Sequence, residues 1–353
     1  MCSKLIAKTP EFLYNTRMVS IQKDVSLKDF SNYKIGGPAK YFLEVSNLDE
    51  LIEGFIQWEK ISKALPIFVL GAGTNLLIGD RGFGGLVIHN KIKDIKILSE
   101  KDTKSQRIKE SKSQRIRVGA GVLMEDLLNF CVQNCLSGLE WAGGLPGTVG
   151  GAVRGNAGAF GGEIKDGVYQ VESVSTYEVS EAAASQVRKQ VRKRKNSECK
   201  FRYRSSIFKD GEGKNEIIIS VELKLQKGDK DLITKQIEEK IEYRKNRHPL
   251  EYPNIGSIFK NIFIEKVPQK LLEQLKDSIK DDPFPILPTA KLLAVAGLKG
   301  KKVGGAMVSQ KHPNFIVNLD NATFRDVLDL IREVKSLIYK KYQIELEEEI
   351  TVF

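Results

Sequence analysis

GGLPGTVGGAVRGNAGAFGG, residues 143–162, is the stretch that decides the fold of this chain. Glycine at this density costs conformational entropy on folding, so a compact protein keeps it where the backbone must approach a neighbour closely or adopt a positive φ. Apolar residues such as Leu145, Val149 and Phe160 are interleaved with the glycines, unlike the Ser-rich or charged composition of a flexible linker. The stretch therefore predicts a loop that holds a large bound cofactor, with a linker as the alternative.

The bulk composition fits a globular protein of two or three domains that stays in the cytoplasm. The chain has 353 residues, of which 41% are hydrophobic, enough to bury a full core. No apolar run approaches the roughly 20 residues of a membrane-spanning helix. The first 17 residues, MCSKLIAKTPEFLYNTR, have no apolar core followed by a small-residue cleavage site. We therefore expect neither export nor a membrane partner.

The cysteines and histidines argue against a metal site or a disulfide framework. No metal-knuckle spacing is found among the four cysteines, which are Cys2, Cys131, Cys135 and Cys199. Cys131 and Cys135 lie one helical turn apart, and we interpret them as buried apolar residues rather than a redox pair. The three histidines form no HExxH motif. We expect no metal and no zinc hydrolase.

The net charge of +11 comes from two segments. Residues 91–117 hold ten Lys and Arg against four Asp and Glu, and residues 186–204 hold nine against one, so the remaining chain is slightly acidic. The first segment repeats KSQRI at 104–108 and 112–116. The stretch SQVRKQVRKRKNSECK, 185–200, has no interleaved aromatics for base stacking. We interpret both as solvated insertions and expect no nucleic-acid partner, with an RNA-binding tract as the alternative.

A tight glycine turn follows the first strands. Ala39–Val45 alternates like a strand, and the span 47–62 predicts an amphipathic helix capped by Asn47. The apolar strand 66–70 then runs directly into Gly-Ala-Gly-Thr-Asn at 71–75, whose successive amides suit a diphosphate. A Rossmann fingerprint is excluded, because position 76 is Leu and extended structure follows over 76–78. An ordinary hairpin turn is the alternative.

The remaining elements complete an α+β pattern. Helices are predicted over 123–135, 229–246, 291–296 and 323–341. Strands are predicted over 115–119, 168–177, 217–225, 305–308, 315–318 and 349–353, and residues 256–261 read as a short strand. Residues 264–286 read as an insertion rich in Lys and Asp.

An ordered set of motifs resembles one family, the UDP-N-acetylenolpyruvoylglucosamine reductases (MurB), flavoenzymes of peptidoglycan precursor synthesis. The matching stretches cover the chain apart from about 19 N-terminal residues and three insertions. They are 33–39 (YKIGGPA), 70–78 (LGAGTNLLI), 144–163 (GLPGTVGGAVRGNAGAFGGE), 203–206 (YRSS), 256–261 (GSIFKN), 290–298, 302–305, 308–318 (VSQKHPNFIVN) and 344–350 (IELEEEI). The PLEYP segment at 249–253 looks like the subgroup that lacks an extra tyrosine-bearing substrate loop.

The resemblance implies a two-module FAD-binding fold of the vanillyl-alcohol-oxidase (PCMH) type, followed by a C-terminal α+β substrate-binding domain. The boundaries that it implies are an extension at 1–19, a first FAD-binding subdomain at 20–90, a second at 91–226 and the substrate-binding domain at 227–353. Basic insertions fall near 98–114 and 180–196, and a third insertion near 264–286. The last strand would return to the active site.

The resemblance also implies two cofactors. FAD would lie between the first two modules, with its diphosphate on residues 71–75 and its ring near 143–152. NADPH would deliver hydride to the flavin and leave, and the UDP-sugar would then enter the same cleft. The implied cofactor-binding residues are Gly71, Ala72, Gly73, Thr74, Asn75, Leu76, Gly143, Gly144, Pro146, Gly147, Thr148, Gly150, Gly151 and Ala152.

Three residues carry the chemistry by resemblance. Hydride addition at C3 of the enolpyruvyl ether places negative charge on the substrate carboxylate, which calls for a fixed cation and a second polar group. Arg204 in YRSS would be the cation, and Glu349 the second group, by its register three residues after Leu346. Ser257 in GSIF would protonate C2, which requires it to be activated and placed about 3 Å from that carbon.

The resemblance also implies polar contacts to the uridine and diphosphate of the substrate, and either Arg or Lys can hold a diphosphate. For Arg244 and Arg247 the alternative is a solvated helix end. The candidates are Tyr203, Arg244, Arg247, Asn261, Lys311 and His312.

The chain departs from the family pattern at several positions. Relatives often carry bulkier residues where Arg154 and Gly155 stand, and a Tyr where Phe160 stands. Thr351 occupies the position of a common Arg. Hydrogen bonds near the flavin would differ accordingly.

Two other functions stay open. Another FAD-dependent oxidoreductase of the same fold, acting on a hydroxy acid or an alcohol, would share the glycine loops but would need neither Ser257 nor Glu349. A nucleic-acid binder would instead use the basic tracts. Whether any insertion reaches the cleft is not fixed by the sequence, nor is NADPH against NADH preference or the oligomeric state.

Overall fold

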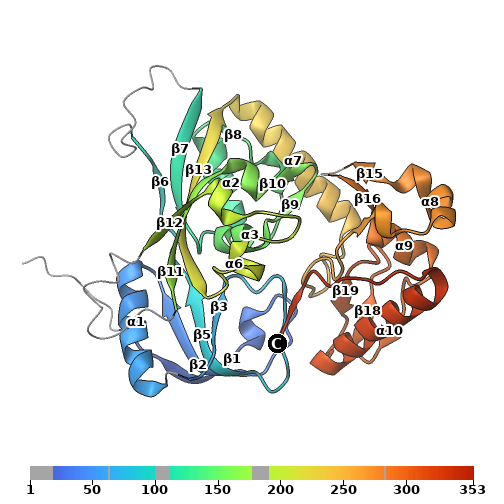
Figure 1. Ribbon diagram of the computed structural model, residues 1–353, viewed down its shortest axis with the longest axis horizontal. Coiled ribbons are helices and arrows are strands. Elements are labelled where there is room, and N and C mark those ends of the chain that lie inside the picture. Colours follow the sequence, from blue (N-terminus) through green and yellow to red (C-terminus); the bar gives the residue numbers. More distant parts are fainter. Residues whose placement is uncertain (1–18, 63, 100–111, 177–190, 282–283) are drawn as a thin grey trace, which may run out of the picture.

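The computed structural model describes residues 19–353 apart from 63, 100–111, 177–190 and 282–283. Three modules follow one another along the chain and are coloured blue to cyan, green to yellow, and orange to red in Figure 1. Strands and helices mix in all three, as an α+β fold requires.

A four-stranded sheet forms the first module. Its order is β1 (Gln22–Ser26), β2 (Pro38–Val45), β5 (Phe83–Asn90) and β3 (Ile67–Leu70), and the last three are parallel. Helix α1 (Leu48–Ile61) begins where the Asn47 side chain accepts a hydrogen bond from Glu50 N, as predicted. Because β3 ends at Leu70, the turn at 71–75 lies at the carboxyl edge of the parallel strands, where open sheets bind ligands.

A six-stranded antiparallel sheet forms the second module. Its order is β12 (Arg192–Lys195), β11 (Val168–Ser175), β13 (Glu216–Lys227), β7 (Ser113–Gly119) and β6 (Ile95–Ile97), with β8 (Leu136–Ser137) also paired to β13. The helices here are α2 (Met124–Gln133), α3 (Val149–Gly155), α4 (Ile164–Gly167) and α6 (Ile207–Asp210). Their apolar residues and those of the sheet make one buried cluster.

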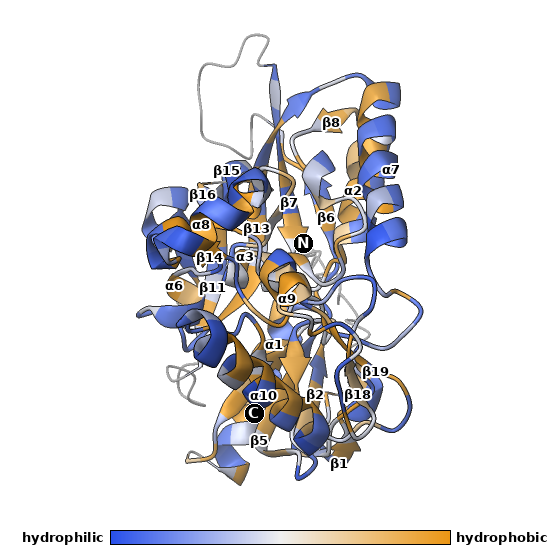
Figure 2. Cartoon of the chain, turned by 90° about the vertical axis from the view of Figure 1, so that its right-hand side faces the viewer, coloured by the Kyte–Doolittle hydropathy of each residue, from blue (hydrophilic) through white to orange (hydrophobic). Residues whose placement is uncertain are grey.

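Helix α7 (Lys230–Arg247) leads out of this module. Asp229 caps it by accepting a hydrogen bond from Leu232 N, and Ile233 and Ile237 are buried against the sheet module. The helix is mostly hydrophilic in Figure 2. Its end at Arg247 agrees with the following Pro249, since the residue before a proline leaves helical geometry.

The glycine-rich stretch at 143–162 is not wholly loop, contrary to the sequence prediction. It contains helix α3 and a short hairpin of β9 (Gly158–Ala159) and β10 (Gly162–Glu163). Thr148 caps α3 by accepting a hydrogen bond from Gly151 N at 3.3 Å, and Asn156 ends it in the left-handed region. Seven residues give no visible helical period, so the cap at Thr148 carries the signal.

The third module packs helices against small sheets. Its strands are β14 (Ile262–Phe263), β15 (Lys280–Asp281), β16 (Pro285–Leu287), β17 (Lys302–Val303), β18 (Ala306–Val308) and β19 (Ile316–Asn318). Its helices are α8 (Gln269–Leu275), α9 (Thr289–Val295) and α10 (Phe324–Tyr342). Helix α10 opens with a reciprocal capping box between Thr323 and Asp326.

The predicted insertion at 264–286 is an integral part of this module. It contains α8 and the β15–β16 hairpin, and β16 pairs with β14. Val267, Leu271 and Leu275 are buried in the apolar core of the module. The segment is therefore held by packing as well as by strand pairing.

The chain finally returns to the first module. Strand β20 (Thr351–Val352) pairs in parallel with β4 (Leu76–Leu77), directly after the 71–75 turn. This strand is shorter than the predicted 349–353. The 256–261 segment forms no strand, because it pairs with Glu348 only through an isolated bridge at Phe259.

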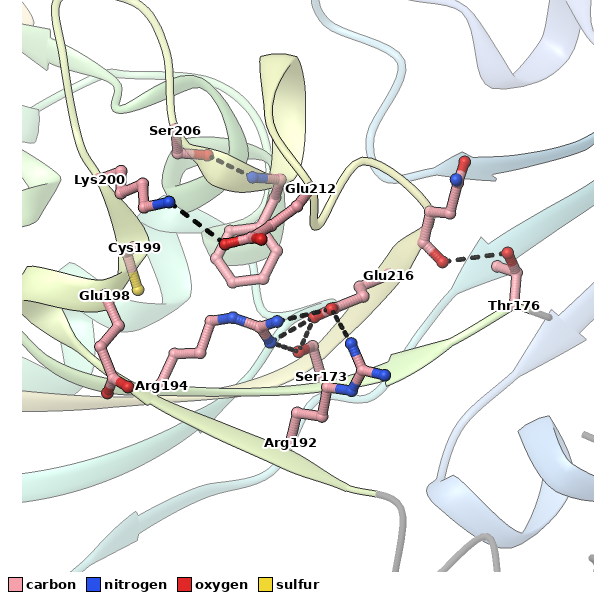
Figure 3. Close-up of polar contacts among 12 residues, drawn as sticks. Ser173, Thr176, Arg192, Arg194, Glu198, Cys199, Lys200, Ser206, Glu212 and Glu216 are labelled. Atoms are coloured by element: carbon pink, nitrogen blue, oxygen red, sulfur yellow. Dashed lines mark hydrogen bonds and ion pairs between the residues drawn. The ribbon is translucent and has the colours of Figure 1, made fainter. Parts of the chain in front are cut away.

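The second basic tract differs from the solvated insertion that the sequence predicted, whereas most of the first insertion, near 98–114, lies outside the described residues. The first KSQRI copy lies outside the described residues, but most of the second belongs to β7, where Ile116 is buried. In the second tract, Arg192 and Arg194 form ion pairs with Glu216, and Lys193 pairs with Glu172 (Figure 3 shows the Glu216 cluster). Four neighbouring basic residues, 192–195, thus form a strand in which three neutralise buried carboxylates.

Glu216 is the centre of this cluster, and its loss is expected to destabilise the protein. Its side chain is only 3% exposed and that of Arg194 14% exposed, and Ser173 Oγ donates to the same carboxylate at 2.6 Å. Glu216→Gln leaves a buried arginine without its partner, which costs about 3–5 kcal/mol of the free energy of unfolding. Urea unfolding measures this change.

A matched control lies beside it in Figure 3. Lys200 and Glu212 are paired at 3.2 Å, but their side chains are 66% and 70% exposed. Glu212→Gln is expected to change the free energy of unfolding by less than about 1 kcal/mol. Equal effects of the two substitutions would contradict the structural role of Glu216.

Candidate active site

One large cavity joins the three modules. Its volume is about 1410 Å³, above the roughly 300–1,000 Å³ common for small-molecule sites. A space of this size holds a dinucleotide and a second ligand better than a single small substrate. Its walls come from the 71–75 turn, the glycine-rich stretch, the YRSS turn and the third module.

The 71–75 turn offers its backbone to the cavity. Gly73 has φ +62°, and a Cβ there would lie 1.9 Å from Phe30 O, so no side chain fits. Among the described residues, the N–H groups of 72–75 donate no turn or loop hydrogen bond to the rest of the chain. Unused amides at a cavity wall suit an anionic phosphate.

The glycine-rich wall faces this turn closely. A Cβ on Gly71 would lie 2.6 Å from Thr148 Oγ1, and one on Gly147 would lie 3.0 Å from Thr74 Oγ1. All the cofactor-binding candidates line the cavity except Gly143, whose carbonyl accepts a hydrogen bond from Arg244 Nε at 2.8 Å. Two glycine walls with unused amides between them fit FAD, a large and flat cofactor with a diphosphate.

Adding a side chain to this wall is expected to weaken FAD binding. Gly147 has φ +114°, a conformation that costs an L-residue about 1–3 kcal/mol. Gly147→Ala should therefore displace the loop and raise the Kd for FAD by about tenfold or more, measured by titrating FAD into the stripped protein. Gly84→Ala is the control, because a Cβ at Gly84 meets nothing within 4 Å. Unchanged FAD affinity in Gly147→Ala would contradict a cofactor role for this wall.

Arg204 and Glu349 meet at one end of the cavity. Arg204 Nε lies 2.7 Å from Glu349 Oε1, an ion pair rather than an aligned hydrogen bond, and Arg204 Nη2 donates to Gly158 O at 2.8 Å. Burial by itself lowers the pKa of the guanidinium, but Glu349 raises it and the net pKa lies above its ordinary value. The structure thus holds a permanent cation here.

The YRSS turn holds Arg204 in a strained conformation. Arg204 has φ +53°, which is uncommon for a side chain of this size and typical of functional sites. Arg202 and Ser205 exchange both backbone hydrogen bonds around the turn. Asn156, fully buried, donates to Arg202 O at 3.0 Å. The turn is therefore fixed from both sides.

Ser257 reaches the same end of the cavity through backbone pairing. Glu349 N donates to Ile258 O at 2.8 Å, so the residues next to Ser257 lie against Glu349. Ser257 lines the cavity, and its hydroxyl makes no hydrogen bond to another described residue. The adjacent Gly256 has φ +83°, and a Cβ there would meet nothing within 4 Å. The serine is open to a ligand.

Tyr203 and Asn261 stand beside this centre. Asn261 N donates to Tyr203 OH at 3.2 Å, and the Tyr203 ring packs edge-on against Phe263 and Phe284. Burial raises the pKa of Tyr203. The Asn261 side chain accepts from Thr289 N. Both Tyr203 and Asn261 line the cavity.

The remaining substrate candidates separate into two groups. Arg244 lines the cavity, and burial lowers its pKa to about 10, with Nη2 buried and unpartnered. Arg247 is exposed and lies over the Tyr243 ring. Lys311 pairs with Glu251, and His312 packs against His248, with its pKa lowered by burial to about 4. The cavity lining does not include Arg247, Lys311 or His312.

Sequence reasoning missed several cations of the cavity wall, among them Arg154, Lys209 and Lys280. Arg154 lines it without an ion pair to any described carboxylate, and burial lowers its pKa. Lys209 Nζ donates to Arg204 O at 3.1 Å, and burial lowers its pKa as well. Lys280 comes from the 264–286 insertion. The departure from the family pattern at Arg154 was the one available signal.

Comparisons with known proteins decide the family. Residues 55–177 match the model of an FAD binding domain, and residues 248–353 match that of the UDP-N-acetylenolpyruvoylglucosamine reductase C-terminal domain. The chain is 35% identical to a UDP-N-acetylenolpyruvoylglucosamine reductase of Carboxydothermus hydrogenoformans, with 98% of each chain covered.

The chain belongs to the UDP-N-acetylenolpyruvoylglucosamine reductase family.

Further relatives agree with this assignment. A UDP-N-acetylenolpyruvoylglucosamine reductase of Caldanaerobacter subterraneus is 34% identical, covering 92% of this chain and 91% of the relative. The crystal structure of the reductase (MurB) from Thermus caldophilus is 29% identical, with a TM-score of 0.68 and coverage of 95% and 100%. They confirm the FAD-binding fold and the family inferred from the sequence motifs.

Both domains that match the family models of this reductase contribute residues to the cavity. The FAD binding domain, 55–177, contains both glycine walls, and the C-terminal domain, 248–353, contains Ser257 and Glu349. In the described ranges no helix is long and apolar enough to cross a membrane. The same ranges contain no group of three His, Cys, Asp or Glu placed to hold a metal ion.

Proposed function

We propose that this protein reduces UDP-N-acetylglucosamine enolpyruvate to UDP-N-acetylmuramate, with NADPH as the hydride donor and FAD as the bound cofactor. The observation that carries the proposal is the meeting of Arg204, Glu349 and Ser257 at one end of a cavity whose other walls fit FAD. The 71–75 turn and the glycine-rich wall would hold FAD, which would supply the hydride chemistry that links NADPH to C3 of the enolpyruvyl group.

Arg204 is proposed to stabilise the substrate carboxylate. Hydride addition at C3 builds negative charge on that carboxylate, and a fixed cation in a partly buried site stabilises it. The ion pair with Glu349 and the bond to Gly158 O orient the guanidinium before the substrate arrives. Glu349 thus acts both beside the substrate and as the group that positions Arg204.

Ser257 is proposed to deliver the proton that C2 requires. Its hydroxyl has no hydrogen bond to another described residue and faces the cavity beside Glu349. The hydride on C3 and the proton on C2 together saturate the double bond and leave the ether intact. A hydroxyl that nothing else engages is free to donate at that point.

The domain boundaries and the setting are part of the proposal. Residues 20–90 and 91–226 would form the two FAD-binding subdomains, and 227–353 the substrate-binding domain. The parallel pairing of β20 with β4 supports a last strand that returns to the active site. The protein would work in the cytoplasm, on a UDP-sugar and without a nucleic-acid partner.

The visible spectrum of the purified protein tests the function. NADPH added without oxygen should bleach the flavin absorbance, and UDP-N-acetylglucosamine enolpyruvate should restore it with formation of UDP-N-acetylmuramate. A colourless protein that cannot be reconstituted with FAD would overturn the proposal. Bleaching by a hydroxy acid or an alcohol, with no recovery on adding the enolpyruvyl substrate, would favour another oxidoreductase of the same fold.

A further inference from the structure

The substrate of the proposed function brings more negative charge than the catalytic end of the cavity accommodates. Besides its carboxylate, a UDP-sugar carries a diphosphate, which calls for cations elsewhere on the wall. Arg244 is the one sequence-predicted diphosphate cation that lines the cavity, and its Nε already donates to Gly143 O. Lys311 is paired with Glu251 and does not itself line the cavity.

Lys280 supplies a cation that the family motifs do not contain. It lies in the 264–286 insertion and lines the cavity. Lys280 and Ile286 are direct partners across the β15–β16 hairpin, so their side chains lie on the same face. Both residues line the cavity, which shows that this face of the hairpin is turned toward the cleft.

The ammonium group of Lys280 is not committed elsewhere. Within the described ranges it forms no ion pair with a carboxylate and no side-chain hydrogen bond. Lys260 and Lys266, in the same domain, are by contrast paired with Glu347. An unpaired lysine at the rim of a ligand cavity is available for an anion.

The hairpin holds Lys280 in a fixed place. Strand β16 pairs with β14, which begins directly after Asn261. Phe263 of β14 stacks on Phe284 with ring centroids 4.9 Å apart, and Tyr203 packs edge-on against both rings. Since Tyr203 precedes Arg204, the insertion is joined to the catalytic end by direct packing.

We propose that Lys280 of strand β15 forms a phosphate subsite of the cleft and binds the diphosphate of the UDP-sugar. The inference rests on the proposed function, because the substrate identifies the anion. NADPH brings phosphates to the same cleft, so the ligand chemistry is a nucleotide phosphate and the two sources are separated by experiment. The insertion thereby serves as part of the substrate wall in a chain of the subgroup without the extra tyrosine loop.

Calorimetric titration of UDP into the FAD-loaded protein tests this subsite without turnover. Lys280→Gln is expected to weaken UDP binding about tenfold, since it removes a charge-assisted hydrogen bond at a rim position. The loss should shrink as salt is raised, because screening weakens the wild-type contact. Lys280→Arg should retain most of the affinity.

Lys276→Gln is the matched control. Lys276 is exposed on the same insertion and does not line the cavity, so its replacement should leave UDP binding unchanged. A parallel titration with NADP⁺ separates the two phosphate sources. Weakening of UDP binding alone supports the proposal as stated, and weakening of NADP⁺ binding alone overturns the assignment to the UDP-sugar.

The outcome is independent of the proposed activity. Unchanged binding of both nucleotides in Lys280→Gln would overturn the subsite, even if the protein reduces the enolpyruvyl substrate normally. A protein that binds UDP through Lys280 but does not reduce the substrate would retain the subsite and lose the proposed function. Steady-state kinetics gives a second test, since Lys280→Gln should raise KM for the UDP-sugar. The rate at which NADPH bleaches the flavin should stay unchanged.

Discussion

Ser257→Ala is expected to slow turnover of the enolpyruvyl substrate by about 10²–10⁴-fold, the range for loss of a positioned general acid. Bleaching of the flavin by NADPH should be unaffected, because no proton to C2 is needed in that half of the reaction. Ser257 is partly exposed and caps no element, so the substitution should not change folding. Stopped-flow absorbance measures the two halves separately.

Two further variants sharpen the test of Ser257. Ser257→Cys keeps a proton donor at the position and should recover part of the lost rate. Ser62 also lines the cavity, but its hydroxyl accepts hydrogen bonds from the neighbouring backbone, so Ser62→Ala should turn over normally. Near-normal turnover in Ser257→Ala would transfer the acid role to another group.

Arg204→Met is expected to lower kcat/KM for the enolpyruvyl substrate by about 10²–10³-fold, as for removal of one stabiliser of developing negative charge. The methionine keeps much of the side-chain volume but removes the cation that Glu349 and Gly158 O orient. It also leaves Glu349 without its partner, so the melting temperature of the variant should fall. Steady-state kinetics measures the loss of kcat/KM, and calorimetric melting measures the fall in melting temperature.

Glu349→Gln completes a double-mutant cycle with Arg204→Met. If Glu349 works by orienting Arg204, its replacement alone should cost much of the activity, and the double variant should lose little more than Arg204→Met. The double variant should also regain thermal stability, since no charge is left unpaired. Additive losses of activity would show that the two side chains act separately.

The elements that the sequence predicts well are those with a local cause. Helix α10 has its capping box at Thr323 and Asp326, and α1 has its cap at Asn47, all visible in the residues themselves. The 71–75 turn follows from an apolar strand that runs into Gly-Ala-Gly. Elements of this kind need no knowledge of distant contacts.

The failures come from contacts between residues far apart in the chain. The 256–261 segment alternates like a strand, but its amides donate to two different partners: Ile258 N to Asn314 O and Lys260 N to Glu347 O. The sequence alone predicts that the 192–195 tract is solvated, because its ion-pair partners Glu216 and Glu172 are distant in the chain. The motifs indicate Arg204, Glu349 and Ser257 as a set, whereas only the fold brings Lys280 to the cleft.

The pairing of β20 with β4 has a consequence for how the protein is made. Residues 76–77 leave the ribosome 275 residues before residues 351–352, which complete the pair. Both glycine walls belong to the earlier part of the chain, whereas Glu349 arrives two residues before β20. Long-range closure of this kind comes late in folding. A nascent chain thus completes both glycine walls well before it adds Glu349.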